Sequence, residues 1–134
     1  MGRLRLKATM AAIATGLESV EGIDKAWPYP EEGAASEGHA VVGPPRFKLG
    51  SGAFRRVLDT ATFPVLIVAG VADLEVTLDK VDALIAGAAA VKDAIEGALA
   101  DVVEFSNVSG GSVERIVLGR VKYAAVRFDV EVTA

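Results

Sequence analysis

The stretch VKYAAVRFDVEVT, residues 121–133, alternates between apolar and polar side chains over most of its length. Successive side chains of a β-strand point to opposite faces of a sheet, so this pattern predicts a strand with one buried face. Arg127, Asp129 and Glu131 are expected to face outward. The residues expected to face the core are Ala124, Val126, Phe128, Val130 and Val132. Other elements of the chain must therefore cover the apolar face of this strand.

Three helices are predicted from apolar residues at helical spacing. The first covers about residues 4–20, where the spacing favours an amphipathic helix over a signal peptide: Leu6, Met10, Ile13, Leu17 and Val20. The second runs from about residue 74 to 85, with Asp73 as its N-cap and an inward stripe of Leu74, Leu78, Val81 and Ile85. The third follows Gly87 and places Val91, Ile95 and Leu99 inward.

Strands make up the rest of the predicted elements. They are expected at residues 23–27, 39–43, 62–70, 102–108 and 112–119, and residues 46–59 are expected to form a hairpin. We place the hairpin turn at residues 50–52 and another turn at Gly110 and Gly111. The segment 62–70 is apolar on both faces, which predicts a central strand or one covered by a partner chain. Pro64 indicates that this strand starts there, bulges or lies at an edge.

The order helix, strands, helix pair, strands predicts an α+β fold. We expect a mainly antiparallel (mixed) sheet, with the N-terminal helix and the central helix pair packed on one face. A length of 134 residues fits a single domain, 1–134, and 51% hydrophobic residues are enough for a core. The longest apolar run, FPVLIVAGVA, is too short to span a membrane, so no membrane association is expected.

The composition excludes several kinds of site. The chain has no cysteine, which removes disulfides, thiolate catalysis and cysteine-built zinc sites, and its net charge of −4 argues against a nucleic-acid-coating protein. The single histidine, His39, follows an acidic loop and could act with a carboxylate as a general base, although such a residue more often caps a strand edge. We expect no enzyme activity, no catalytic residue, no cofactor and no metal.

A stiff aromatic segment leads into an acidic loop. Trp27 and Tyr29 alternate with two prolines, which favour an extended backbone, and the loop that follows carries Glu31, Glu32 and Glu37. This segment suits a loop used for docking. Alternatively, Trp27, expected on the same strand face as Ile23, fills the sheet against the first helix while the prolines prevent edge pairing.

The expected hairpin is basic: it carries Arg46, Lys48, Arg55 and Arg56. These cations could contact a phosphate backbone or simply be solvated. They also complement the acidic loop, and a head-to-tail ring interface requires two unlike patches on one chain. Our hypothesis is that the hairpin of one subunit lies near the acidic loop of the next, with apolar contact from Phe63, Val65 and Ile67.

Five segments in this order resemble the tail terminator proteins of long-tailed bacteriophages, especially those of actinobacterial phages. They are LKATMAAIATGLESVEGI (6–23), KAWPYP (25–30), HAVVGPP (39–45), TFPVLIVAGVADLEVTLDKVDALIAG (62–87) and GRVKYAAVRFDVEVTA (119–134). The segment GSGAFRRVLDTAT (50–62) departs from the family, whose members usually carry a basic or aromatic-rich strand there.

The resemblance implies a homo-oligomeric, hexameric ring that caps the tail tube and presents a docking face to the neck of the capsid. The implied partners are other copies of the chain, the tail tube protein and a head-completion (stopper) protein. Genomic DNA would pass through the lumen without sequence-specific binding. The implied location is the tail–neck junction of the virion, after assembly in the cytoplasm of the bacterial host. The alternatives are a stopper protein of the same neck or, from another class, a small ligand-binding or enzymatic domain.

Overall fold

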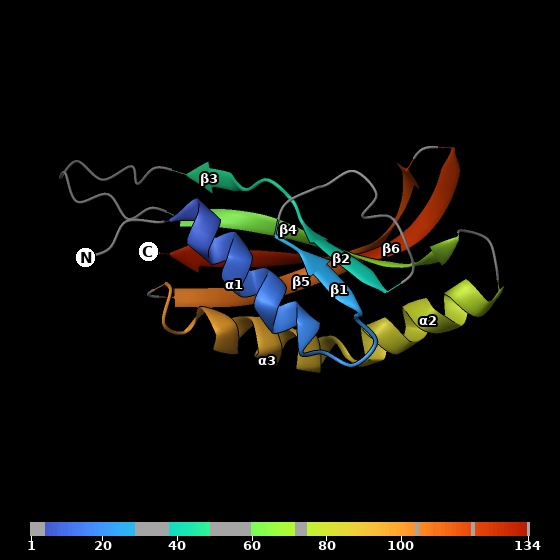
Figure 1. Ribbon diagram of the computed structural model, residues 1–134, viewed down its shortest axis with the longest axis horizontal. Coiled ribbons are helices and arrows are strands. Elements are labelled where there is room, and N and C mark those ends of the chain that lie inside the picture. The colour runs from blue at the N-terminus through green and yellow to red at the C-terminus, as the bar shows by residue number, and fades with distance from the viewer. Residues whose placement is uncertain are drawn as a thin grey trace.

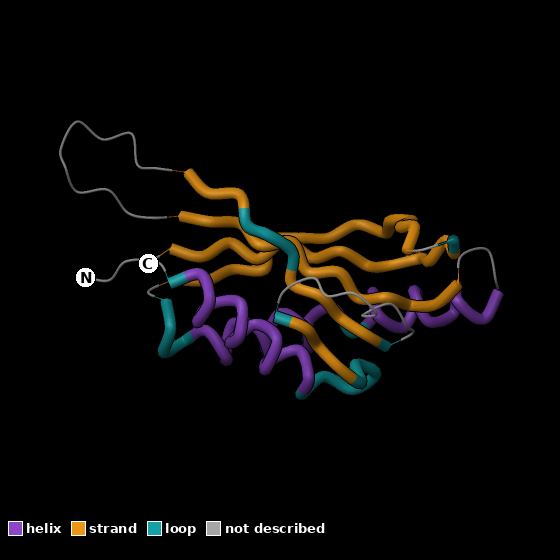
Figure 2. The backbone as a smooth tube through the Cα atoms, turned by 45° about the horizontal axis from the view of Figure 1, so that its top comes forward, coloured by secondary structure: helices purple, strands orange, loops and turns teal. Residues whose placement is uncertain are grey.

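Nine helices and strands follow one another in the computed structural model, which describes residues 5–28, 38–48, 60–71, 75–103, 105–118 and 120–133. They are α1 (Leu6–Glu18), β1 (Lys25–Trp27), β2 (His39–Val42), β3 (Arg46–Lys48), β4 (Thr60–Val71), α2 (Glu75–Ala86), α3 (Ala88–Leu99), β5 (Phe105–Leu118) and β6 (Val121–Thr133). The three helices lie on one face of the sheet, and no helix of the described residues lies on the opposite face (Figures 1 and 2). The predicted α+β fold is therefore confirmed.

The strands form one mixed sheet in the order β1-β2-β4-β6-β5, and β3 also pairs with β4. β1 and β2 are parallel, whereas every other pair is antiparallel. β2 and β3 share the same edge of β4: β2 lies opposite residues 65–67 and β3 lies opposite residues 60–62. β4 is thus central, as its apolar composition predicted.

Pro64 lies in the interior of β4, at the break between β2 and β3. Its carbonyl oxygen accepts a 2.7 Å hydrogen bond from the backbone N–H of Gly43, on the side away from β6. The nitrogen of a strand residue points to the same side as its carbonyl, so the missing N–H of Pro64 costs no hydrogen bond to β6. A proline fits this central strand because the neighbouring edge is interrupted there.

The core lies between the helices and the inner face of the sheet. Phe63, Val65 and Ile67 of β4 alternate into it and are each 0% exposed. The predicted stripe of α3 and the predicted inner face of β6 are confirmed, because all of these residues are buried: Val91, Ile95, Leu99, Ala124, Val126, Phe128, Val130 and Val132. α1 packs closely on α3, since a Cβ on Gly16 would lie 2.7 Å from the carbonyl oxygen of Ala94. Ile13 and Leu17 complete the core there, while Leu6 is exposed.

The predicted turn at Gly110 and Gly111 is wrong, because β5 runs through both residues. Gly110 lies opposite Asp129 and Gly111 lies opposite Phe128, with a bulge between Val108 and Gly110. A Cβ on Gly111 would collide with the carbonyl oxygen of Arg127, so glycine here permits a close backbone approach.

The predicted hairpin also differs. Arg46–Lys48 pairs with Thr60–Thr62, the start of β4, and not with an arm directly after residue 52. The expected turn at residues 50–52 lies outside the described residues.

The predicted inward stripe of α2 is wrong in two places. Leu78 is 58% exposed and Ile85 is 50% exposed, whereas Thr77 and Val81 are buried. Thr77 reaches β4 because Gly70 has no side chain: a Cβ on Gly70 would lie 2.8 Å from the Thr77 hydroxyl. α2 therefore buries the face centred on Thr77 and Val81 and leaves its apolar flank uncovered. Asp73 and Leu74 lie outside the described residues.

Candidate interaction surfaces

Trp27 lies on the open face of the sheet. It is opposite Val41, while its neighbour Ala26 is buried in the core beneath the helices. The alternative that Trp27 fills the sheet against α1 is therefore wrong. Ile23 is buried in the core, so the two residues do not share a face, because the regular strand begins only at Lys25.

Two neighbouring side chains contact the Trp27 ring on this face. The ammonium of Lys25 lies 5.1 Å from the ring centroid, within range of a cation–π interaction. The His39 ring lies at 6.4 Å in an edge-on arrangement. The buried indole nitrogen Nε1 of Trp27 has no hydrogen-bond partner among the residues that the structure describes. This side of the open face is thus aromatic and cationic.

The β5–β6 side of the open face carries an ion-paired cluster. Arg127 Nε lies 3.1 Å from Asp129 Oδ1, and its Nη1 lies 3.5 Å from Glu114 Oε2. Hydrogen bonding to Asp129, with charge attraction from Asp129 and Glu114, raises the pKa of Arg127 above its ordinary value. The three side chains are about one-third exposed, so these ion pairs contribute little to stability, about 0–1 kcal/mol each.

The residues predicted to form the subunit interface are partly buried in the core, partly exposed and partly outside the described residues. Phe63, Val65 and Ile67 are fully buried in the core, so they are not available to a neighbouring subunit, and their assignment to the interface is corrected. The apolar character of β4 reflects its central place in the sheet. Arg46 is exposed on β3, and Lys48 ends that strand. Tyr29, Glu31, Glu32, Glu37, Arg55 and Arg56 lie outside the described residues, so the pairing of acidic loop and basic hairpin stays a prediction.

An apolar groove that the sequence did not indicate lies between α2 and β5. It has a volume of about 250 Å³ and is lined by Ile85, Ala88, Gly111, Ser112, Val113, Val126 and Phe128. We call it the α2–β5 groove. On its β5 side, Val113 is 53% exposed and Val117, farther along the strand, is 63% exposed. The alternating valines of SVERIVL predict a strand, but their spacing does not show that this part of the strand stays exposed.

The edge of β5 beside this groove is open. In an antiparallel ladder, alternate residues direct their backbone groups to opposite sides. Pro64 directs its carbonyl away from β6, so Asp129, opposite it, directs its backbone groups toward β5. The same alternation holds along the β5–β6 pair. The backbone N–H and C=O groups of Val113 and Val117 therefore point away from β6. In the described part of the chain, β6 is the only strand that pairs with β5.

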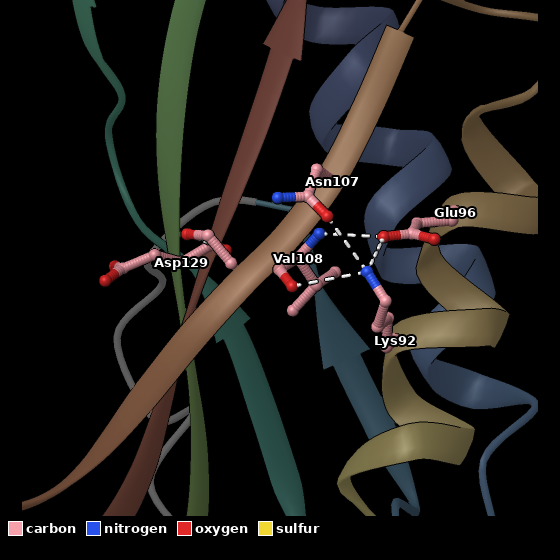
Figure 3. A network of polar contacts seen from close by, with 6 residues as sticks. Lys92, Glu96, Asn107, Val108 and Asp129 are labelled. Carbon is pink, nitrogen blue, oxygen red and sulfur yellow. Dashed lines mark hydrogen bonds and ion pairs between the residues drawn. The ribbon is translucent and has the colours of Figure 1, made fainter.

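The other half of the β5 edge is capped by α3 (Figure 3). Glu96 Oε2 accepts hydrogen bonds from Lys92 Nζ at 2.6 Å and from the Val108 N–H at 2.9 Å. Lys92 Nζ also donates to Asn107 Oδ1 at 2.9 Å and lies 3.4 Å from the Val108 carbonyl oxygen. Hydrogen bonding to Lys92, together with the Val108 N–H, lowers the pKa of Glu96 despite its partial burial. The Lys92–Glu96 pair thus satisfies the edge groups of Val108.

A second hollow of about 290 Å³ lies on the other flank of α2, near Glu21, Asp24 and Lys80. Within the described ranges, no group of three or more His, Asp or Glu side chains could hold a metal ion. The carboxylates suggested as partners of His39 lie outside those ranges. None of the described helices is long and apolar enough to cross a membrane.

Comparison with known proteins adds no family assignment. The chain matches no model of a known protein family, and no curated protein has a similar sequence.

Proposed function

We propose that this protein is a structural virion component of the tail terminator type, a ring of identical subunits that caps the phage tail tube and connects it to the neck of the capsid. The observation that carries the proposal is the α2–β5 groove, where exposed apolar side chains meet an open strand edge. Uncovered apolar surface and unpaired strand edges are features of proteins that assemble with other chains.

The order of elements supports the same proposal. The five segments that resemble tail terminators correspond to α1, β1, β2, the β4–α2 unit and β6. These elements supply much of the core and of the sheet, whereas α3 and β5 lie outside the matched segments. The ring would be hexameric, with the tail tube protein and a stopper protein as neighbours and with DNA crossing the lumen. The Trp27 side of the open face is the candidate contact with one of those neighbours.

The proposal is tested by deleting the gene from the phage genome and examining lysates by electron microscopy. We expect capsids and tails that do not join, with tails of uncontrolled length, and rescue when the wild-type gene is supplied in trans. Tails of normal length without capsids would assign the protein to the stopper position instead. Intact, infectious virions in the deletion strain would overturn both assignments.

A further inference from the structure

We infer that the α2–β5 groove binds the start of helix α1 of a second copy of this chain. The inference deepens the proposed function and rests on it only in treating the chain as a subunit of a homo-oligomer. It identifies the two unlike surfaces that a head-to-tail contact requires.

The receiving surface is apolar, with a carboxylate on its α2 side and a cation on its β5 side. Leu78 and Ile85 are seven positions apart and therefore share one flank of α2, and Ile85 lines the groove. Asp82 lies four positions after Leu78 and three before Ile85, so it is next to both on the helix surface. Val113 forms the opposite wall, where Arg115 is the neighbouring charge. A partner seated here would bury apolar surface and meet a carboxylate at the rim.

The start of α1 has the complementary chemistry. Leu6 is 45% exposed and stands between two exposed cations, Arg5 and Lys7. The helix has no acidic residue in its first turn and no side-chain N-cap hydrogen bond. The N-terminus of a helix carries a partial positive charge, so the flanking cations are unfavourable there within one chain and favour an anionic partner.

The two surfaces lie apart along the molecule, because the groove is at the junction of α2 and α3. The start of α1 is at one end of the sheet, and α2 lies toward the other (Figures 1 and 2). One chain cannot bring them together, so a contact between them joins two copies, and in the head-to-tail form each copy uses its two surfaces on two different neighbours. Such contacts repeat from copy to copy and close into a ring when the rotation between neighbours permits it.

Disulfide cross-linking tests the contact directly, because the chain has no cysteine of its own. Leu6→Cys and Ile85→Cys are made as two separate full-length proteins, mixed and oxidised. We expect a covalent dimer that contains one copy of each variant, identified by mass spectrometry. The control replaces Ile85→Cys with Val76→Cys, which is 57% exposed on the other flank of α2. Equal yields from the two mixtures would overturn the inference.

Association of the uncross-linked protein tests the energetics by sedimentation velocity over a range of concentrations. Leu78→Ser should weaken self-association by about tenfold or more, because it removes apolar surface that the contact buries. Val76→Ser should leave association unchanged. A wild-type chain that stays monomeric at every concentration, or equal effects of the two variants, would contradict the inference.

A charge exchange separates contact from misfolding. Lys7→Glu and Asp82→Lys should each weaken association, and the double variant should recover part of it, because the opposite charges are restored across the contact. Asp93→Lys, an exposed change on α3, is the control and should have no effect. If the double variant associates no more strongly than the single variant that associates least, this charge pair is excluded. These measurements use purified protein, so their failure would leave the gene-deletion test of the proposed function unaffected.

Discussion

At the scale of single residues, adjacent positions on one strand have opposite structural roles. Phe128 is buried in the core, and Asp129, next to it, lies on the open face beside Arg127. The alternation of β6 was predictable from the sequence because every second residue of this strand faces the helices. The same logic failed for Ile23 and Trp27, since the residues between them are not all in a strand.

Truncating these two residues should therefore have different effects on the free energy of unfolding. Phe128→Ala should lower it by about 3–5 kcal/mol, because it removes a buried aromatic ring and leaves a cavity. Asp129→Ala should lower it by no more than about 1 kcal/mol, the contribution of a partly exposed ion pair. Chemical denaturation of both variants and the wild type measures the difference. Equal losses would contradict this assignment of the two faces of β6.

At the scale of helices and strands, the buried face could be predicted from the sequence where the apolar residues of a helix lie on one side only. α3 buries Val91, Ile95 and Leu99 as predicted. α2 has apolar residues on more than one side, and spacing alone does not reveal that the small Gly70 draws Thr77 toward the sheet. Gly110 and Gly111 were predicted to turn because glycine permits turns, yet β5 uses Gly111 for close packing. The groove depends on both of these features, so it could not be predicted.

The link between α3 and β5 should make stability depend on pH through Glu96. Its folded pKa is lowered from 4.5, so its contribution is present above the unfolded value and is lost as the pH falls through the folded one. Near pH 6, Glu96→Gln should be less stable than wild type by on the order of 1 kcal/mol, and this difference should shrink as the pH falls below about 4. Urea denaturation at several pH values measures it. Asp93→Asn is the control, and a Glu96→Gln difference that is independent of pH would contradict the prediction.

At the scale of the whole molecule, one half of the β5 edge has side-chain hydrogen-bond partners and the other half does not. The Lys92–Glu96 pair satisfies Val108, whereas the edge near Val113 and Val117 is unpaired in the described part of the chain. Natural proteins protect exposed strand edges because such edges pair with other chains. Another chain can therefore pair with β5 only at the end of the strand that carries the groove.

Removing the protection should therefore increase irregular association. In the double variant Lys92→Ala/Glu96→Ala, the edge groups of Val108 lose their partners, so we expect faster aggregation on mild heating with a rise in β-aggregate dye fluorescence. The control is Lys122→Ala/Glu131→Ala, which removes the same two charges from exposed positions of β6. Equal aggregation rates for the two variants would show that the pair does not protect the edge.

The break between β2 and β3 at Pro64 has a consequence for how the sheet opens. In the described part of the chain, β3 pairs only with the first three residues of β4, and the Gly43–Pro64 hydrogen bond is the backbone contact between this ladder and that of β2. β3 can therefore separate from β4 while β1 and β2 stay in place. Native-state hydrogen exchange should show this as faster exchange of the amide protons of β3 than of those of β2. β3 could rearrange when a neighbouring molecule binds without any loss of the core.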